Sequence, residues 1–143
     1  MRIFISLFLL IFLFGGTGNA KSINLICVMK SSKMNVNGNI QYDDVSKVQD
    51  QVLIIDLAKK TLLDYGIAPG VPKIEYKNID INDKTIEWGD YSENFALNKN
   101  TINRISGQLI STSSYDKDSN FYKTLGISYI QMVSDCRMKE KKF

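Results

Sequence analysis

The chain has 143 residues, a formal net charge of +3 at pH 7 and no histidine. The absence of histidine excludes Ser-His-Asp and Cys-His catalytic machinery and any metal site built on histidine. Lysines and arginines are scattered along the chain, and so small a charge surplus does not indicate a strongly charged partner. We therefore expect no nucleic-acid partner.

The first twenty residues predict a secretory signal peptide. Arg2 supplies a short positive region, residues 3–14 are apolar apart from Ser6, and the small residues Gly18 and Ala20 precede a cleavage site. The apolar run is shorter than the roughly 20 residues of a transmembrane helix, which favours cleavage over an uncleaved membrane anchor. We expect a periplasmic or secreted protein with no stable membrane span after cleavage.

Removal of residues 1–20 leaves a single domain, residues 21–136, followed by a short basic tail at residues 137–143. The only cysteines, Cys27 and Cys136, lie near the two ends of this domain. In an oxidising compartment such a pair predicts one disulfide, worth on the order of 4–5 kcal/mol in the chain-entropy model. Two thiols are too few for a structural zinc site, so no metal is expected.

The composition favours strands over helices, because Ile, Val, Tyr, Phe and Thr occur in short runs separated by Asn, Asp, Gly and Lys. In chain order, we expect a strand at residues 22–30, a hairpin at Asn37-Gly38, a hairpin of residues 51–57 and 61–65, and strands or strand pieces at residues 73–81, 84–90, 93–98, 100–103, 107–115 and 125–136. Loops are expected at residues 66–72 and 115–120. Two points stay open: residues 43–51 form a helical turn or a loop, and residues 53–63 could instead form one helix.

About eight strands at intervals of 8–12 residues predict an all-β domain, a small antiparallel barrel or sandwich. A disulfide that joins the first and last strands favours the barrel. Trp88 lies on an alternating strand, and we expect its large side chain in the core.

The most motif-like run is the turn around Arg104. Asn103 fits the first position of a type I turn, with Arg104 and Ile105 at its centre. Ser106 provides a second local acceptor, and Gly107 suits the left-handed conformation of a bulge. Asn103, Ser106 and Gly107 are thus assigned structural roles. Arg104 is not required by the turn and is a candidate binding residue.

Tyr115 is the other candidate binding residue. It lies in a late cluster of aromatics beside a hydroxyl-rich run, and exposed tyrosines often serve in protein recognition. The alternative is a half-buried strand with tyrosine and threonine facing water.

Residues 116–120 resemble the first half of a calcium-binding loop. Phe121 stands where that loop needs glycine, and Ile127 stands where it needs glutamate. We therefore expect an ordinary surface loop without a metal.

The order of Cys27, LIID at residues 53–56, IEW at residues 86–88, INRISGQL at residues 102–109 and Cys136 resembles a group of small exported bacterial β-domain proteins. The resemblance covers most of the mature chain. It implies a β-domain and no particular activity.

A more distant resemblance is to periplasmic inhibitors of c-type lysozyme. These are small barrels with a terminal disulfide and a Ser-Gly-x-x-Tyr loop that enters the lysozyme cleft. Ser106 and Gly107 match this loop, and Ile110 occupies its tyrosine position.

These observations predict a non-enzymatic binding or interaction module, with another exported protein as one candidate partner. No catalytic residue and no cofactor are expected. The alternatives are an inhibitor of a lysozyme-type cell-wall hydrolase and a small-ligand carrier, since an eight-stranded barrel can just hold one small ligand.

Overall fold

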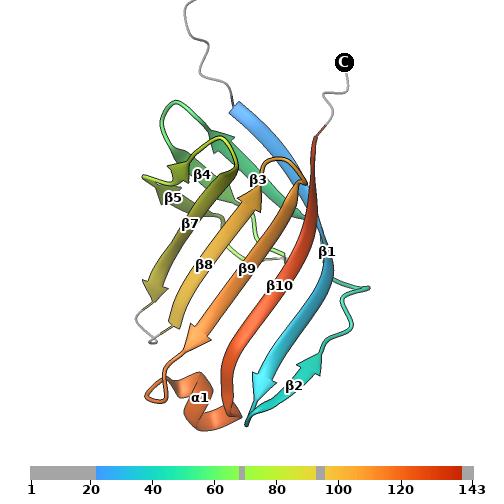
Figure 1. Ribbon diagram of the computed structural model, residues 1–143, viewed down its shortest axis with the longest axis vertical. Helices are drawn as coiled ribbons and strands as arrows, with labels where there is room; N and C mark the ends of the chain where they lie inside the picture. Colours follow the sequence, from blue (N-terminus) through green and yellow to red (C-terminus); the bar gives the residue numbers. More distant parts are fainter. Residues whose placement is uncertain (1–21, 68–69, 93–95, 140–143) are drawn as a thin grey trace, which may run out of the picture.

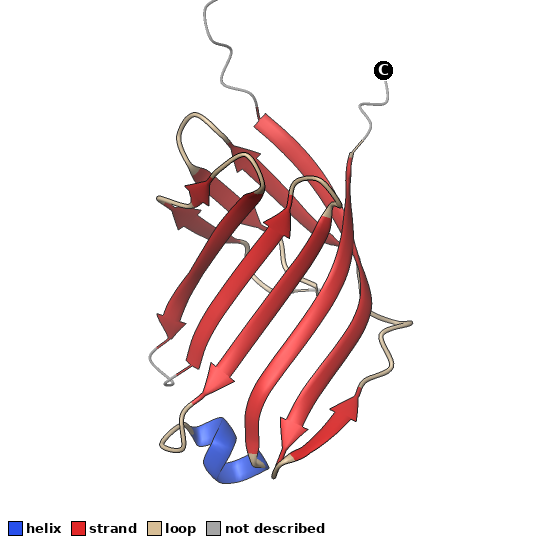
Figure 2. Ribbon diagram, viewed as in Figure 1, coloured by secondary structure: helices blue, strands red, loops and turns tan. Residues whose placement is uncertain are grey.

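A computed structural model describes residues 22–67, 70–92 and 96–139. The predicted signal peptide lies outside the described residues. The described part of the chain forms ten strands in one antiparallel sheet and one short helix (Figures 1 and 2). The all-β prediction is confirmed, with ten strands in place of about eight.

The strands are β1 (Ser22–Val36), β2 (Asn39–Tyr42), β3 (Gln51–Asp56), β4 (Thr61–Asp64), β5 (Ile74–Lys77), β6 (Asp80–Ile81), β7 (Thr85–Ser92), β8 (Ala96–Asn103), β9 (Gln108–Tyr115) and β10 (Ile127–Met138). Helix α1 (Asn120–Leu125) lies between β9 and β10. β10 continues through Arg137 and Met138, the first two residues of the predicted tail.

The sheet curls into a barrel-like shape with a seam. Its strand order is β5-β4-β3-β1-β10-β9-β8-β7-β6, and β2 pairs with the far end of β1. The two edge strands, β5 and β6, are separated in the chain by residues 78–79 alone. The curled sheet is therefore bridged at its edges by its own backbone. In Figure 1, β3, β4 and β5 lie behind the upper half of the sheet, and the lower half is left uncovered.

The predicted disulfide joins the first and last strands. Cys27 and Cys136 are directly opposite each other on β1 and β10, with Cα atoms 3.9 Å apart. The bond lies inside the paired part of the sheet. The disulfide joins the strands from the two ends of the domain. The unpaired edges of the sheet, which we call the seam, are therefore formed by strands from the middle of the chain, β5 on one side and β6 with β7 on the other.

The single alternating strand predicted at residues 73–81 is wrong. Asn78 has a left-handed backbone with φ 55°, which breaks the strand. Asparagine tolerates this conformation better than most residues. The N–H of Ile79 then donates to the carbonyl of Lys60 at 3.1 Å, and the Ile79 side chain enters the core. β5 consequently pairs with β4, whereas β6 pairs with β7.

Helix α1 begins inside the segment predicted as a polar loop. Ser119 caps its N-terminus by accepting a hydrogen bond from the Tyr122 N–H at 3.1 Å, and Gly126 ends it with φ 67°. Six residues are too few to show helical periodicity in the sequence. No helix in the described part of the chain has the length and apolar character to cross a bilayer.

Other local predictions are confirmed. Asn37 and Gly38 both have positive φ and form the turn between β1 and β2. Residues 51–64 form the β3–β4 hairpin, so the helical alternative is wrong. The open segment between β2 and β3 is a loop.

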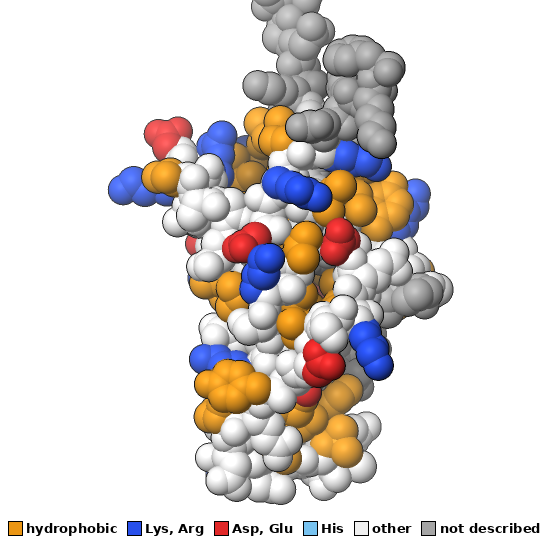
Figure 3. Space-filling view, turned by 90° about the vertical axis from the view of Figure 1, so that its right-hand side faces the viewer, with side chains coloured by type: hydrophobic (Ala, Val, Ile, Leu, Met, Phe, Trp, Pro, Cys, Tyr) orange, Lys and Arg blue, Asp and Glu red, His pale blue; other side chains and the backbone are white. Residues whose placement is uncertain are grey.

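Charged side chains of both signs are interspersed over the side of the molecule that carries β1 and β2 (Figure 3). This mixture matches the small net charge of the whole chain. The surface seen from this side is that of an ordinary exposed sheet, with hydrophobic side chains in separate groups.

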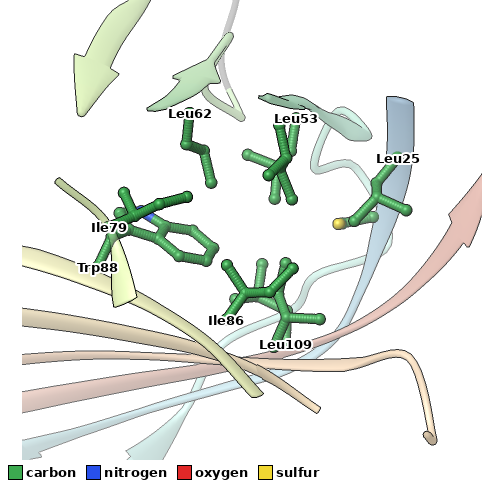
Figure 4. Close-up of a cluster of buried hydrophobic side chains, with 10 residues drawn as sticks. Leu25, Leu53, Leu62, Ile79, Ile86, Trp88 and Leu109 are labelled. Carbon is green, nitrogen blue, oxygen red and sulfur yellow. The ribbon is translucent and has the colours of Figure 1, made fainter. Parts of the chain in front are cut away.

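The core side chains converge on one another inside the curled sheet (Figure 4). Trp88 is 6% exposed, which confirms its prediction as a core residue. The core consists of Leu25, Cys27, Leu53, Ile55, Leu62, Ile79, Ile86, Trp88, Ile102 and Leu109.

Removal of the disulfide by a double change, Cys27→Ser with Cys136→Ser, should lower the free energy of unfolding. The bond spans 109 residues of sequence, so the loss should be roughly 2–5 kcal/mol. Urea denaturation measures it. Reduction of the unmodified protein should give the same shift, whereas an unfolding midpoint that ignores reductant would contradict the prediction.

Candidate functional site

The concave face of the sheet changes character along β8 and β9. At its upper end Ile102 and Leu109 face each other in the core. The next pair on the same face is Asn100 with Ser111, and the pair after that is Asn98 with Ser113. A barrel of this size normally fills its interior with apolar side chains. Here the lower half of the interior is lined by amide and hydroxyl groups instead.

These polar residues line a groove of about 230 Å³, which we call the concave groove. Its apolar lining consists of Met29, Ile67, Val71 and Met132, and Gln51, Asp64 and Tyr76 also line it. Its polar side consists of Asn98, Asn100, Ser111, Ser113 and Ser134. The groove therefore offers apolar and hydrogen-bonding side chains next to one another, since Met132 lies opposite Ser111 and Met29 lies opposite Ser134.

Hydrogen bonds between side chains fix two of the polar residues that line the groove, Asn98 and Ser113. The Ser113 hydroxyl donates to Asn98 Oδ1 at 2.7 Å, and Asn98 Nδ2 donates to Asp90 Oδ1 at 3.0 Å. The hydroxyls of Ser111 and Ser134, in contrast, make no hydrogen bond with another described residue. Polar groups on an inner face that protein atoms do not satisfy are available to a ligand.

Asp64 is the only carboxylate that lines the concave groove among the described residues. Gln51 Nε2 donates to both of its oxygens, at 2.9 and 2.8 Å, and the Gly66 N–H donates at 2.7 Å. These bonds hold Asp64 as a structural acceptor. A carboxylate bound in this way is poorly placed to serve as a general base.

Tyr76 stands where the concave groove meets the seam. Its ring lies 6.4 Å from the ring of Trp88, tilted by 56°. Burial, followed by the negative charges of Asp90 and Asp64, raises the pKa of Tyr76 above its ordinary value. Its hydroxyl thus stays protonated at neutral pH.

The turn after β8 has the geometry that the sequence predicted. Asn103 Oδ1 accepts hydrogen bonds from the N–H groups of Ile105 and Ser106, at 2.9 and 3.0 Å. Ser106 Oγ accepts one from the Gln108 N–H at 3.3 Å. Gly107 has φ 73°, and its N–H donates to the Asn103 carbonyl at 2.8 Å.

The two candidate binding residues do not come together. Arg104 Nη1 donates to the Asn82 carbonyl at 2.6 Å, and the Arg104 N–H donates to the Lys84 carbonyl at 2.8 Å. Arg104 thus ties this turn to the β6–β7 turn, a partner that local sequence cannot reveal. Tyr115 lies at the other end of β9 and stacks on Phe121, with ring centroids 4.9 Å apart. Arg104 and Tyr115 cannot form one site.

No group of three or more His, Cys, Asp or Glu side chains in the described part of the chain is arranged to hold a metal ion. The loop that resembles a calcium site leads into α1, where Lys123 lies 3.7 Å from Asp118.

Comparison of the chain with protein-family models, curated proteins and solved structures gives no match. The two resemblances noted in the sequence therefore stay predictions. The concave groove and the seam are the features of the molecule that point to a function.

Gly107→Ala should destabilise the protein more than Gly38→Ala. Both glycines have positive φ, so alanine costs roughly 1–2 kcal/mol at either position. At Gly107 the added Cβ would lie 2.6 Å from the Cys136 carbonyl oxygen, whereas the space at Gly38 is open. The extra loss at Gly107 should be about 1–3 kcal/mol. Urea denaturation compares the two, and equal losses would contradict the steric explanation.

The raised pKa of Tyr76 predicts a loss of stability in alkali. A group that holds its proton more tightly when folded stabilises the protein fully below its unfolded pKa near 10. That stability is lost as pH rises through the higher folded pKa. Urea midpoints at about pH 8 and about pH 11 should fall more for the unmodified protein than for Tyr76→Phe. Identical falls would show that Tyr76 does not carry the effect.

Proposed function

We propose that the protein is an exported, non-enzymatic binding module that holds a small polar ligand in the concave groove. The observation that carries the proposal is the switch from Ile102 and Leu109 to Asn100 and Ser111 on one inner face. Residues that only packed the interior would stay apolar. The hydroxyls of Ser111 and Ser134, which bond to no other described residue, are available to bind a ligand there.

Export is supported by the predicted signal peptide and by the disulfide. Disulfides form and persist in oxidising compartments such as the periplasm and the extracellular space. Cys27 and Cys136 are paired, and no cysteine is free. The periplasmic or secreted location predicted from the sequence is therefore part of this proposal.

The lack of an enzymatic role is supported by the bonds that the potentially reactive side chains already make. The chain has no histidine, and both of its cysteines are used in the disulfide. Asp64 is held by three hydrogen bonds from neutral donors. The concave groove is thus equipped to bind through hydroxyl and amide groups, without an activated nucleophile or base.

The lining defines the class of ligand. Serine hydroxyls and asparagine amides each donate and accept, which suits a ligand rich in hydroxyl groups. No lysine or arginine occurs among the described residues that line the groove, so it has no cationic side chain to pair with an anion. The upper interior is occupied by the apolar core side chains. We infer that the ligand is a small sugar or polyol. The protein would then be a small-ligand carrier whose ligand is polar.

The lysozyme-inhibitor alternative would act elsewhere on the molecule. Its motif residues, Ser106 and Gly107, lie in the turn between β8 and β9, beyond Ile102 and Leu109. Changes in the concave groove should therefore leave that activity intact, and the two functions can be separated by mutation.

Ser111→Val tests the proposal, with Ser114→Val as its matched control. Valine at 111 fills the groove and removes a free hydroxyl, whereas Ser114 is exposed on the opposite face of the same strand. Isothermal titration with glucose, N-acetylglucosamine and their linear trimers should show binding. Ser111→Val should weaken it at least tenfold, and Ser114→Val should not.

Two results would overturn this proposal. One is the absence of binding to every sugar up to about 10 mM, a free energy weaker than roughly −3 kcal/mol. The other is an equal effect of Ser111→Val and Ser114→Val, which would place the sugar outside the concave groove.

A further inference from the structure

The seam between β5 and β7 leaves two strand edges without partners. Among the described strands, β5 is hydrogen-bonded only to β4, and β7 beyond Glu87 is bonded only to β8. β6 covers the first part of the β7 edge and then the chain turns away at Asn78. The exposed backbone N–H and C=O groups along such an edge can pair with another strand.

A cavity of about 440 Å³ occupies the seam. Residues 76–80 line it from one edge, and residues 87–90 and 97–99 line it from the other. This volume lies within the range of roughly 300–1,000 Å³ that is typical of ligand sites. The seam is thus an open space between two unpaired edges.

Trp88 lines this space and carries a buried, unsatisfied donor. The residue as a whole is 94% buried, and its Nε1 has no hydrogen-bond acceptor in the described part of the chain. In the view of Figure 4, the indole nitrogen lies beside Ile79 and on the side away from Leu25. Ile79 itself lines the seam cavity. Buried N–H groups are normally paired, so an acceptor is missing here.

Gly89 allows β7 and β8 to approach each other closely. A Cβ at this position would collide with the backbone carbonyl of Asn98, so β7 and β8 approach each other closely here. Glycine within a strand often marks a place where another backbone comes near. The close contact at Gly89 is therefore with β8, and beyond Glu87 the opposite edge of β7 has no strand partner among the described residues.

The charges along the seam favour a cationic side chain. Asp80 and Asp90 line the cavity and form no ion pair with another described residue. Glu87 is already paired with Lys99, at 3.6 Å. Lys77 also lines the cavity, and it leaves the carboxylates in excess.

We propose that the seam binds an extended peptide segment of a partner by β-strand addition to β7. The segment would continue the ladder that β6 begins, supply a carbonyl acceptor to Trp88 Nε1, and place a lysine or arginine near Asp90. Main-chain pairing gives affinity in this mode of recognition, and alternate side chains give specificity. The inference goes beyond the proposed function, because it assigns a second occupant to a neighbouring site.

The single tryptophan provides a direct readout. In a ¹⁵N-labelled sample, Trp88 gives the one indole N–H resonance. The probe is a capped peptide, Thr-Lys-Val-Lys-Val-Thr. It should move this resonance downfield in a saturable way. Replacing both of its lysines by glutamate, or its central valine by proline, should weaken binding at least tenfold.

Asp90→Asn provides the variant, with Asp118→Asn as its matched control. Asparagine keeps an oxygen acceptor for Asn98, so the fold should be retained. Asp90→Asn should weaken the lysine peptide about threefold to tenfold, and Asp118→Asn should have no effect. Ser111→Val should also leave peptide binding unchanged, which separates this site from the concave groove. An indole resonance that ignores the peptide, or equal responses to the lysine, glutamate and proline peptides, would overturn the proposal.

Discussion

The pairing of β1 with β10 is the constraint on which the rest of the structure depends. It brings the two ends of the domain together, and the Cys27–Cys136 bond fixes its register. In a sheet, a slip of one residue would exchange the inner and outer faces of a strand. The register at this pair therefore determines that Leu109 and Ser111 face inward on the neighbouring β9. Both the core and the concave groove follow from it.

Sequence reasoning succeeded where the chemistry is local or the partner is unique. The Asn37-Gly38 turn, the acceptor role of Asn103 and the pairing of two lone cysteines are all of this kind. It failed at Asn78, although the alternation changes phase there: the apolar residues are Ile74 and Tyr76 before the break and Ile79 and Ile81 after it. The bond from Ile79 to Lys60 that stabilises the break joins distant parts of the chain. Local propensity cannot anticipate such a contact.

The concave groove was beyond the reach of the sequence for a related reason. Alternation normally places apolar residues inward, yet Leu97 is 54% exposed while Asn98 lies on the inner face. In the part of β8 before Ile102, the polar residues therefore face inward and the apolar Leu97 faces outward. Only the long-range register shows that the asparagines and serines share one interior surface. The hydroxyl-rich run on β9 was visible in the sequence, but the sequence did not show which of its side chains face the interior.

The position of the disulfide also gives the domain an unusual covalent topology. The chain leaves Cys27, passes once around the curled sheet and returns to Cys136, so the backbone and the sulfur bridge form a closed ring around the interior. Both chain termini lie outside this ring. Fraying of either terminus therefore cannot unwrap the interior. Access for any molecule depends on the open lower end and the seam, where β5 and β7 are not hydrogen-bonded to each other.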